Sequence, residues 1–275
     1  IHNYFDIPRN ALTYEASFNS GDYEGNSKTN SWYIKNDTSL ENGVKISFGA
    51  RIEDFKTTVS PKADDELLIP NQYNQQWLID KRISNMESQK ATLEDRNMYP
   101  AITLAKHFDL GLKTSLSFGE TTARPNFREL AYVETLDPIR NSLFKGNPAL
   151  KTSQIKNFDF RVDWNLSESD LVAVSLFKKQ IANPIQATKG NPLLEIPHKG
   201  QNLTWATGTD TFVNSDSATV EGIELECKLG LNSFNDILSN FRIGGNLTWS
   251  QSEVALSQFE IDSFPGIGVS PNYEN

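Results

Sequence analysis

Apolar and polar residues alternate with a period of two along most of this chain. The clearest runs lie at 44–53, 157–164, 223–231 and 241–249. Because successive side chains of a β-strand point to opposite faces, each run predicts a strand with one apolar face. Weaker runs bring the set to nine, at 10–19, 29–40, 97–107, 111–121 and 169–182. Helical periodicity is scarce, so we predict an all-β protein.

The links between these runs alternate strictly between short and long. The short links suit hairpin turns and lie at 40–43, 109–111, 165–169 and 231–236. The long links lie at 58–96, 122–152, 183–216 and 252–275. Loops longer than about 12–15 residues are uncommon in compact soluble domains. Outer-membrane barrels, by contrast, have short periplasmic turns at one rim and long extracellular loops at the other.

Alternation alone does not separate a membrane barrel from a soluble β-sandwich, whose strands also have one apolar and one polar face. The link pattern and the length of the runs favour an antiparallel, up-and-down transmembrane β-barrel. On this interpretation the apolar face meets lipid and the polar face lines the lumen. The residues expected to face lipid are Phe158, Phe160, Val162, Trp164, Ile223, Leu225, Phe241, Ile243, Leu247 and Trp249.

Aromatic residues are expected in girdles at the two membrane interfaces of such a barrel. Trp164 stands beside a short link and Trp249 beside a long one, so they would mark opposite interfaces. Tyr33, Tyr99 and Phe177 are further girdle candidates. In a sandwich the same aromatics would belong to the core.

Charge and cysteine content exclude several classes of protein. The formal net charge of −9 argues against a nucleic-acid partner, which would favour a basic face. The single cysteine, Cys227, allows neither an internal disulfide nor a cysteine zinc site. No run approaches eighteen apolar residues, so no transmembrane helix is predicted. The chain begins at Ile1 without a visible signal peptide, as a mature or cut chain would.

Catalytic and metal-binding motifs are missing from the sequence. The histidines His2, His107 and His198 have neither HxxxH nor HExxH spacing. No P-loop, G-x-S-x-G or G-x-G-x-x-G pattern occurs. We therefore expect no catalytic residue, no metal site and no cofactor, and we do not expect an enzyme.

Four sequence blocks resemble TonB-dependent outer-membrane receptors, in particular those of Bacteroidetes. They read "LSFGETTARPNFREL" (116–130), "GNPALKTSQIKNFDFRVDW" (146–164), "AVSLFKKQIANPI" (173–185) and "NSDSATVEGIELECKLGL" (214–231). The resemblance implies a barrel of about 22 strands with an N-terminal plug in its lumen. It also implies energised import of a siderophore, haem, cobalamin or a glycan.

This chain departs from the full family pattern, because it has about nine predicted strands, no plug, no TonB box and no aromatic closing strand. We therefore expect residues 1–275 to be a partial barrel domain from the later half of such a receptor. The resemblance implies the Gram-negative outer membrane as its location. Its implied partners are outer-membrane lipid, the TonB complex through an N-terminal part, a surface lipoprotein lid, and a small-molecule or glycan ligand.

Two other interpretations stay open at this point. One is a receptor-like barrel that serves as a structural scaffold in an outer-membrane complex. The other is a secreted, soluble β-sandwich that acts as a binding module.

Five residues are candidates for ligand contacts in the extracellular loops. Tyr73 and Trp77 lie among amides in "NQYNQQWLIDKR" and could stack on a sugar or siderophore. Arg124, Asn126 and Arg128 could contact an anionic or hydroxyl-rich ligand. The structural alternative is that Pro125 ends the strand and that the arginines anchor the loop to rim carboxylates. We favour this structural role for 124–128.

Overall fold

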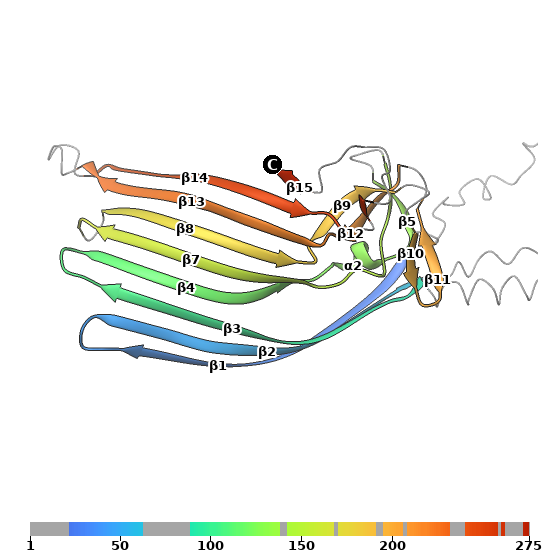
Figure 1. The fold of residues 1–275 in the computed structure, drawn as a ribbon, viewed down its shortest axis with the longest axis horizontal. Coiled ribbons are helices and arrows are strands. Elements are labelled where there is room, and N and C mark those ends of the chain that lie inside the picture. The colour runs from blue at the N-terminus through green and yellow to red at the C-terminus, as the bar shows by residue number, and fades with distance from the viewer. Residues whose placement is uncertain are drawn as a thin grey trace, which may run out of the picture.

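The computed structural model describes residues 22–62, 89–137, 142–167, 170–190, 195–205, 208–231, 240–257, 260–261 and 272–274. Its main element is an antiparallel sheet in the order β1-β2-β3-β4-β7-β8-β13-β14-β15 (Figure 1). The strands are β1 (Tyr23–Ser39), β2 (Val44–Pro61), β3 (Ala91–His107), β4 (Leu112–Ala123), β7 (Ser153–Asn165), β8 (Leu171–Ala182), β13 (Ser217–Gly230), β14 (Arg242–Ala255) and β15 (Asn272–Glu274). The prediction of an antiparallel up-and-down sheet is confirmed.

Eight of the nine predicted strands correspond to β1–β4, β7, β8, β13 and β14. The remaining predicted run, 10–19, lies outside the described residues. The ninth strand of the sheet is instead β15, which pairs with Glu253–Ala255 of β14. It falls in the stretch 252–275 that the sequence analysis predicted as a long link, because three residues are too few to show alternation.

The short and long links lie at opposite ends of the sheet (Figure 1). The described short links 40–43 and 108–111 lie at one end, as do the end of β7 and the start of β8. The long ones begin at the ends of β2, β4, β8 and β14, which lie together at the other end of the sheet, and we call this the loop end. An outer-membrane barrel has this arrangement, with turns at one rim and long loops at the other.

Two of the long links, those after β4 and β8, contain regular elements that were not predicted from the sequence. The link after β4 contains the one-turn helix α2 (Phe127–Leu130) and the short strands β5 (Glu134–Asp137) and β6 (Ser142–Lys145). The link after β8 contains β9 (Ile185–Lys189), β10 (Glu195–His198), β11 (Gln201–Thr204) and β12 (Asp210–Asn214). Four of these six short strands form a second sheet in the order β5-β6-β12-β9, and β10 and β11 form a hairpin.

One face of the main sheet is apolar and exposed. A row that crosses five strands shows this face, through the pairings Leu116↔Phe160, Phe160↔Leu176, Leu176↔Ile223 and Ile223↔Trp249. Trp249 is 65% exposed and Leu247 67% exposed. In the described part of the chain no second sheet covers this face, and an exposed apolar face is what the membrane-barrel interpretation predicts.

The predicted lipid-facing residues within strands all lie on this face, and Phe241, directly before β14, is 60% exposed. Three further aromatic predictions are wrong, because Tyr33, Tyr99 and Phe177 lie on the opposite face. Their strand partners are charged residues, since Arg51 pairs with both tyrosines and Asp159 with Phe177. Each stands one position away from an outward residue, and one position reverses the face.

The opposite face is polar and carries an ion-pair chain across β4, β7 and β13. Arg161 reaches Asp163 at 2.6 Å and Glu226 at 2.9 Å. Lys113 and Lys228 extend the chain at 3.8 Å from Asp163 and 2.8 Å from Glu226. Such a face suits a water-filled or plug-filled lumen.

The buried core lies at the loop end rather than along the sheet. The first cluster joins the ends of β2 and β3 to the link after β4, through Val59, Ala91, Leu130, Ala131, Val133 and Leu150. The second consists of Tyr132, Leu203, Trp205 and Val213. None of the helices in the described ranges is long and apolar enough to cross a membrane.

Candidate functional site at the loop end

Strands β3 and β4 separate before they reach the loop end. Their ladder runs only from His107↔Lys113 to Ala101↔Gly119. The β2–β3 ladder continues to Val59↔Ala91, and the β4–β7 ladder to Ala123↔Ser153. We call the gap between 91–100 of β3 and 120–123 of β4 the seam. Figure 1 shows β1, β2 and β3 bending away from β4 at this level.

Pro100 explains why the ladder stops where it does. It is the first residue of β3 beyond the last pair, Ala101↔Gly119. Proline has no N–H to donate, and it is tolerated where that side of the strand is unpaired. The ladder to β2 continues unbroken through Ala50↔Pro100, so the unpaired side faces β4.

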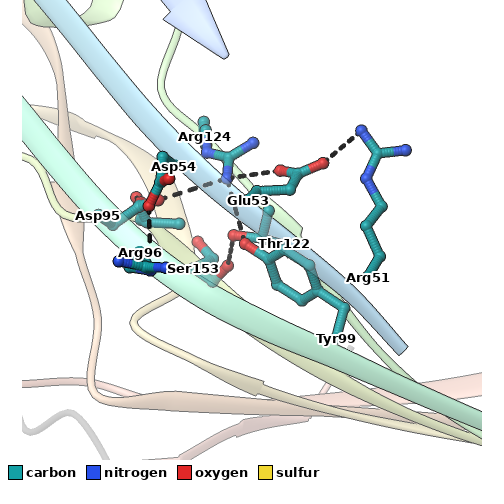
Figure 2. A network of polar contacts seen from close by, with 10 residues as sticks. Arg51, Glu53, Asp54, Asp95, Arg96, Tyr99, Thr122, Arg124 and Ser153 are labelled. Atoms are coloured by element: carbon teal, nitrogen blue, oxygen red, sulfur yellow. Dashed lines mark hydrogen bonds and ion pairs between the residues drawn. The ribbon is translucent and has the colours of Figure 1, made fainter. Parts of the chain in front are cut away.

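Arg124 bridges the seam from the residue that follows β4. Its Nη2 donates to Glu53 Oε2 at 2.9 Å, to Asp95 Oδ1 at 3.3 Å and to the Tyr99 hydroxyl at 3.1 Å. Figure 2 shows the guanidinium pointing among these three residues, which belong to β2 and β3. Side-chain contacts thus join the strands where backbone bonds do not.

The surroundings of Arg124 hold its charge firmly. Its side chain is 18% exposed, and its guanidinium carbon lies 4.2 Å from the centroid of the Phe55 ring. Burial by itself lowers the pKa of Arg124, but the hydrogen bonds and charges of Glu53, Tyr99 and Asp95 outweigh it and raise the pKa. The Nε atom is buried and has no partner among the described residues.

Neighbouring groups complete the cluster. Asp95 accepts a second hydrogen bond from Thr152 Oγ1, at 2.6 Å, from the far end of the same long link. Glu53 also pairs with Arg51 at 2.5 Å. Both ends of the link 124–152 are therefore tied to Asp95, which closes it against β3.

Asn126 is exposed, and its side chain caps the start of the helix α2. Its side chain accepts from the Glu129 amide at 2.9 Å, and the Glu129 carboxylate accepts from the Asn126 amide at 2.9 Å. This reciprocal pair is a capping box, which satisfies two N–H groups at the start of a helix. The "NFREL" block is thus a helix-start signal.

The "GNPAL" block packs against the end of α2. A Cβ at Gly146 would overlap the carbonyl oxygen of Ala131, so only glycine fits at this approach. The next residue, Asn147, donates its amide to Glu129 O at 2.6 Å and its side-chain Nδ2 to Phe212 O at 2.9 Å. Arg128 stacks at 4.4 Å over the Phe144 ring.

A second contact across the loop end comes from the β10–β11 hairpin. His198 Nε2 lies 3.3 Å from the Lys90 carbonyl oxygen, and Lys199 Nζ donates to the same oxygen at 2.6 Å. Burial lowers the pKa of His198, and the nearby charge of Lys199 lowers it further, against the opposing hydrogen bond with Lys90. The folded hairpin therefore favours the neutral imidazole more than the unfolded chain does.

The structure gives each ligand candidate a different place. Tyr73 and Trp77 lie outside the described residues. Arg124, Asn126 and Arg128 lie together at the loop end, and all three make contacts within the protein. For Arg124 these are the expected rim carboxylates. Ligand contact by any of the five stays a prediction.

The partners of Arg124, namely Glu53, Asp95 and Tyr99, could not be predicted from the sequence. Glu53 is 71 positions away in the chain, and only the strand register brings it to the seam. Only Glu53 offered a signal, as a polar position of the run 44–53, because Asp95 falls in the predicted long link 58–96. Within the described ranges, no group of three or more His, Cys, Asp or Glu could hold a metal ion.

Comparison with known proteins decides the family. A family model described as "TonB dependent receptor-like, beta-barrel" matches residues 2–272. The chain belongs to the TonB-dependent receptor family. TonB-dependent receptor barrels lie in the outer membrane of Gram-negative bacteria, which gives the location of this one. Among curated proteins, none matches the sequence significantly.

Solved structures of TonB-dependent receptors share the fold at low sequence identity. The copper transporter OprC has 11% identity and a TM-score of 0.51, over 83% of this chain and 29% of that one. The hemophore receptor HasR of Serratia marcescens, solved with its hemophore and heme, has 11% identity and a TM-score of 0.50, over 86% and 42%. The alcaligin receptor FauA of Bordetella pertussis has 17% identity and a TM-score of 0.50, over 85% and 31%.

This TonB-dependent receptor chain thus spans less than half the length of the solved receptors that it matches. The likeness shows the barrel fold and names no ligand. A kinship with the receptors of Bacteroidetes in particular stays a prediction.

Proposed function

We propose that this chain is the later barrel portion of an outer-membrane receptor that imports a scarce or bulky nutrient by TonB-coupled transport. The observation that carries this proposal is the family match over nearly the whole chain. The nutrient classes that we propose are siderophores, haem, cobalamin and glycans. The TonB complex would act through an N-terminal part of the receptor.

The two faces of the sheet support a membrane-spanning role. The outward apolar stretch of β2 runs from Val44 to Ile52, which matches the roughly nine to eleven residues that a tilted spanning strand needs. We propose that this face contacts lipid and that the face carrying Arg161 lines the lumen. The loop end would then face the outside of the cell.

Ligand selection would take place in the long links at the loop end. Arg124 and Asn126 are committed to contacts within the protein, which favours a structural role for them. Tyr73 and Trp77 therefore remain the better ligand candidates of the five. A surface lipoprotein covering this end stays a further proposed partner.

Growth of a deletion strain tests the proposed transport. The gene encoding the complete receptor is deleted, and growth is measured with ferric siderophores, haem, cobalamin or glycans as the limiting nutrient. Loss of growth on one nutrient, restored by the wild-type gene but not in a strain without TonB, is the expected result. Unchanged growth on all of them, with other outer-membrane proteins lost from the membrane, would point to the scaffold.

A further inference from the structure

Asn36 interrupts the apolar, outward face of the main sheet. It pairs with Phe48, which is the middle residue of the outward apolar stretch of β2 from Val44 to Ile52. Because directly paired residues share one face, Asn36 points outward near the middle of this stretch. Trp32 and Ile34 of β1 precede it on the same face. A polar amide therefore lies in the middle of an apolar surface.

The side chain of Asn36 has hydrogen-bonding groups to spare. Thr38, two positions along the same face, donates from Oγ1 to Asn36 Oδ1 at 2.7 Å. This leaves one lone pair on Oδ1, and within the described residues both N–H groups of Nδ2 are without an acceptor. Acyl chains offer no acceptor, and an unpaired amide is costly in hydrocarbon. Lipid alone therefore leaves Asn36 unsatisfied.

We propose that the outward face of β1 and β2 around Asn36 is the contact surface between two copies of the receptor in the membrane. The copies are related by a two-fold axis along the membrane normal, since two-fold dimers are the commonest homo-oligomers. Asn36 lies beside this axis and faces its counterpart in the second copy. This inference rests on the proposed orientation of the apolar face toward lipid.

The self-complementary chemistry of the amide selects a second copy as the partner. Each Nδ2 donates to the free lone pair of the opposite Oδ1, so two hydrogen bonds cross the axis. An axis along the membrane normal brings residues of equal height together, so Asn36 meets an identical amide at its own depth. A different protein would have to supply a matching polar group at that depth. In coiled coils, one buried Asn likewise specifies the oligomeric state at a cost in stability.

Bulky apolar side chains surround the amide and supply the packing of this contact. Trp32, Ile34 and Phe48 are 60%, 76% and 51% exposed. Lipid is as apolar as these residues, so association in a membrane depends on close packing and on hydrogen bonds between side chains. The apolar residues thus provide the contact area, and the amides provide the specificity.

Sedimentation equilibrium of the complete receptor in detergent tests the proposal. The wild type is expected to be a dimer. Asn36→Leu removes the amide but keeps the bulk of the side chain, and it should raise the dissociation constant at least about tenfold, because both hydrogen bonds across the axis are lost. Asn30→Leu is the matched control, since Asn30 lies on the same face of β1 but pairs with Asp54, beyond the apolar stretch. A monomeric wild type, or equal dissociation constants for the two variants, overturns the proposal.

Heat-modifiable migration shows whether Asn36→Leu still folds. A folded variant that has lost the dimer is the expected result. A variant that fails to fold would mean that the amide is bonded within its own barrel, and this outcome overturns the proposal in favour of a partner in the same chain.

Disulfide crosslinking in outer membranes locates the contact. Ile34→Cys, in a receptor whose other cysteines are replaced by serine, keeps Asn36 and places a thiol beside the axis. Oxidation with iodine, which enters the bilayer, should give a product of twice the receptor's mass. Leu225→Cys is the matched control, because it lies on the outward face of β13, which five strands separate from β1. Equal crosslinking at both positions, or a product only with a protein of another mass, overturns the proposal.

A spin label distinguishes failure of the contact from failure of the membrane orientation. The label is placed by Leu247→Cys in the same cysteine-free background. Accessibility to oxygen but not to a water-soluble nickel complex puts position 247 in lipid. A label in water would overturn the orientation itself, whereas a label in lipid with a monomeric wild type would overturn the contact alone.

Discussion

Arg124 contacts two strands that share no backbone hydrogen bonds with its own strand at this level. Its guanidinium meets Glu53 of β2 and Asp95 of β3, and it covers the Phe55 ring. Glu53 and Asp95 are largely buried, at 9% and 15% side-chain exposure. Removal of the arginine would leave two buried carboxylates together without their shared cation.

Arg124→Ala is therefore expected to destabilise the loop end by about 3 kcal/mol, the usual cost of removing one partner of a buried ion pair. The measurement is the urea dependence of protease cleavage in the link 124–152 of the complete receptor. Arg96→Ala is the control, because Arg96 is 75% exposed and pairs with Asp54 at the surface. A surface pair contributes at most about 1 kcal/mol. Equal cleavage of the two variants would contradict a bridging role for Arg124.

At the residue scale, the structural role of Arg124 can be predicted from the sequence, but the residues that it contacts cannot. "ARPNFREL" indicates a strand end and a loop anchored by arginine, and the structure agrees for Arg124. The capping role of Asn126 is also readable, since Glu129 follows three positions later. The choice of Glu53 and Asp95 depends on the register of β2 and β3, which local sequence does not encode.

Among the secondary-structure elements, α2 and the 146–150 segment form a unit that closes the link after β4. Gly146 allows this segment to lie against the last carbonyls of α2, and Asn147 bonds both α2 and β12. Leu130 and Leu150 then pack on Val59 and Ala91. The unit therefore depends on a close backbone approach at one residue.

Gly146→Ala should destabilise this unit by about 1–3 kcal/mol, because the added methyl overlaps backbone oxygens that cannot move freely. Protease cleavage of the link reports the loss. Gly119→Ala is the matched control in β4, where a Cβ would meet Ala101 Cβ at an ordinary 3.7 Å. If the control were as sensitive as Gly146→Ala, the overlap would not be the cause.

The β10–β11 hairpin should loosen as the pH falls. The pKa of His198 is lower in the folded hairpin than its usual value of about 6.5, so folding favours the neutral ring. The stabilisation is fully present above that usual value and is lost as the pH falls below it toward the folded pKa. Fluorescence of Trp205, next to β11, measures this change. His198→Gln should show no such pH dependence, and a similar pH dependence in the variant would assign it to another group.

Strand length decides which elements the sequence predicts. The long strands of the main sheet repeat the apolar–polar alternation often enough to be recognised, as in 157–164. The strands of the links have three to five residues, and their pairing is set by tertiary contacts such as Asn147 to Phe212. Periodicity cannot detect elements of that length.

At the scale of the whole molecule, the main sheet has one apolar face and one polar face. Its outward face is exposed and apolar along β7, β13 and β14, whereas its other face carries Arg161, Asp163 and Glu226. A side chain's position along the strand decides which environment it meets. Neighbouring residues of one strand should therefore differ sharply in their tolerance of charge.

Leu247→Arg is expected to cost about 2–4 kcal/mol, the penalty for arginine on the lipid face near the middle of the bilayer. Thr248→Arg changes the next residue, which points to the polar face, and it should be tolerated. Heat-modifiable migration of the complete receptor measures the folded fraction of each. The reverse order of stability would mean that the two faces have been exchanged.

The contact between β3 and β4 is stiff on one side of the seam and easier to deform on the other. Between the short links and Ala101↔Gly119, strands β3 and β4 are joined by backbone hydrogen bonds, which fix their spacing. Beyond that pair, their separation depends on side chains that can change rotamer, above all Arg124. The width of the barrel lumen and the width of its opening at the loop end thus depend on different contacts. A force applied at the loop end would widen that opening, while the lumen kept its diameter.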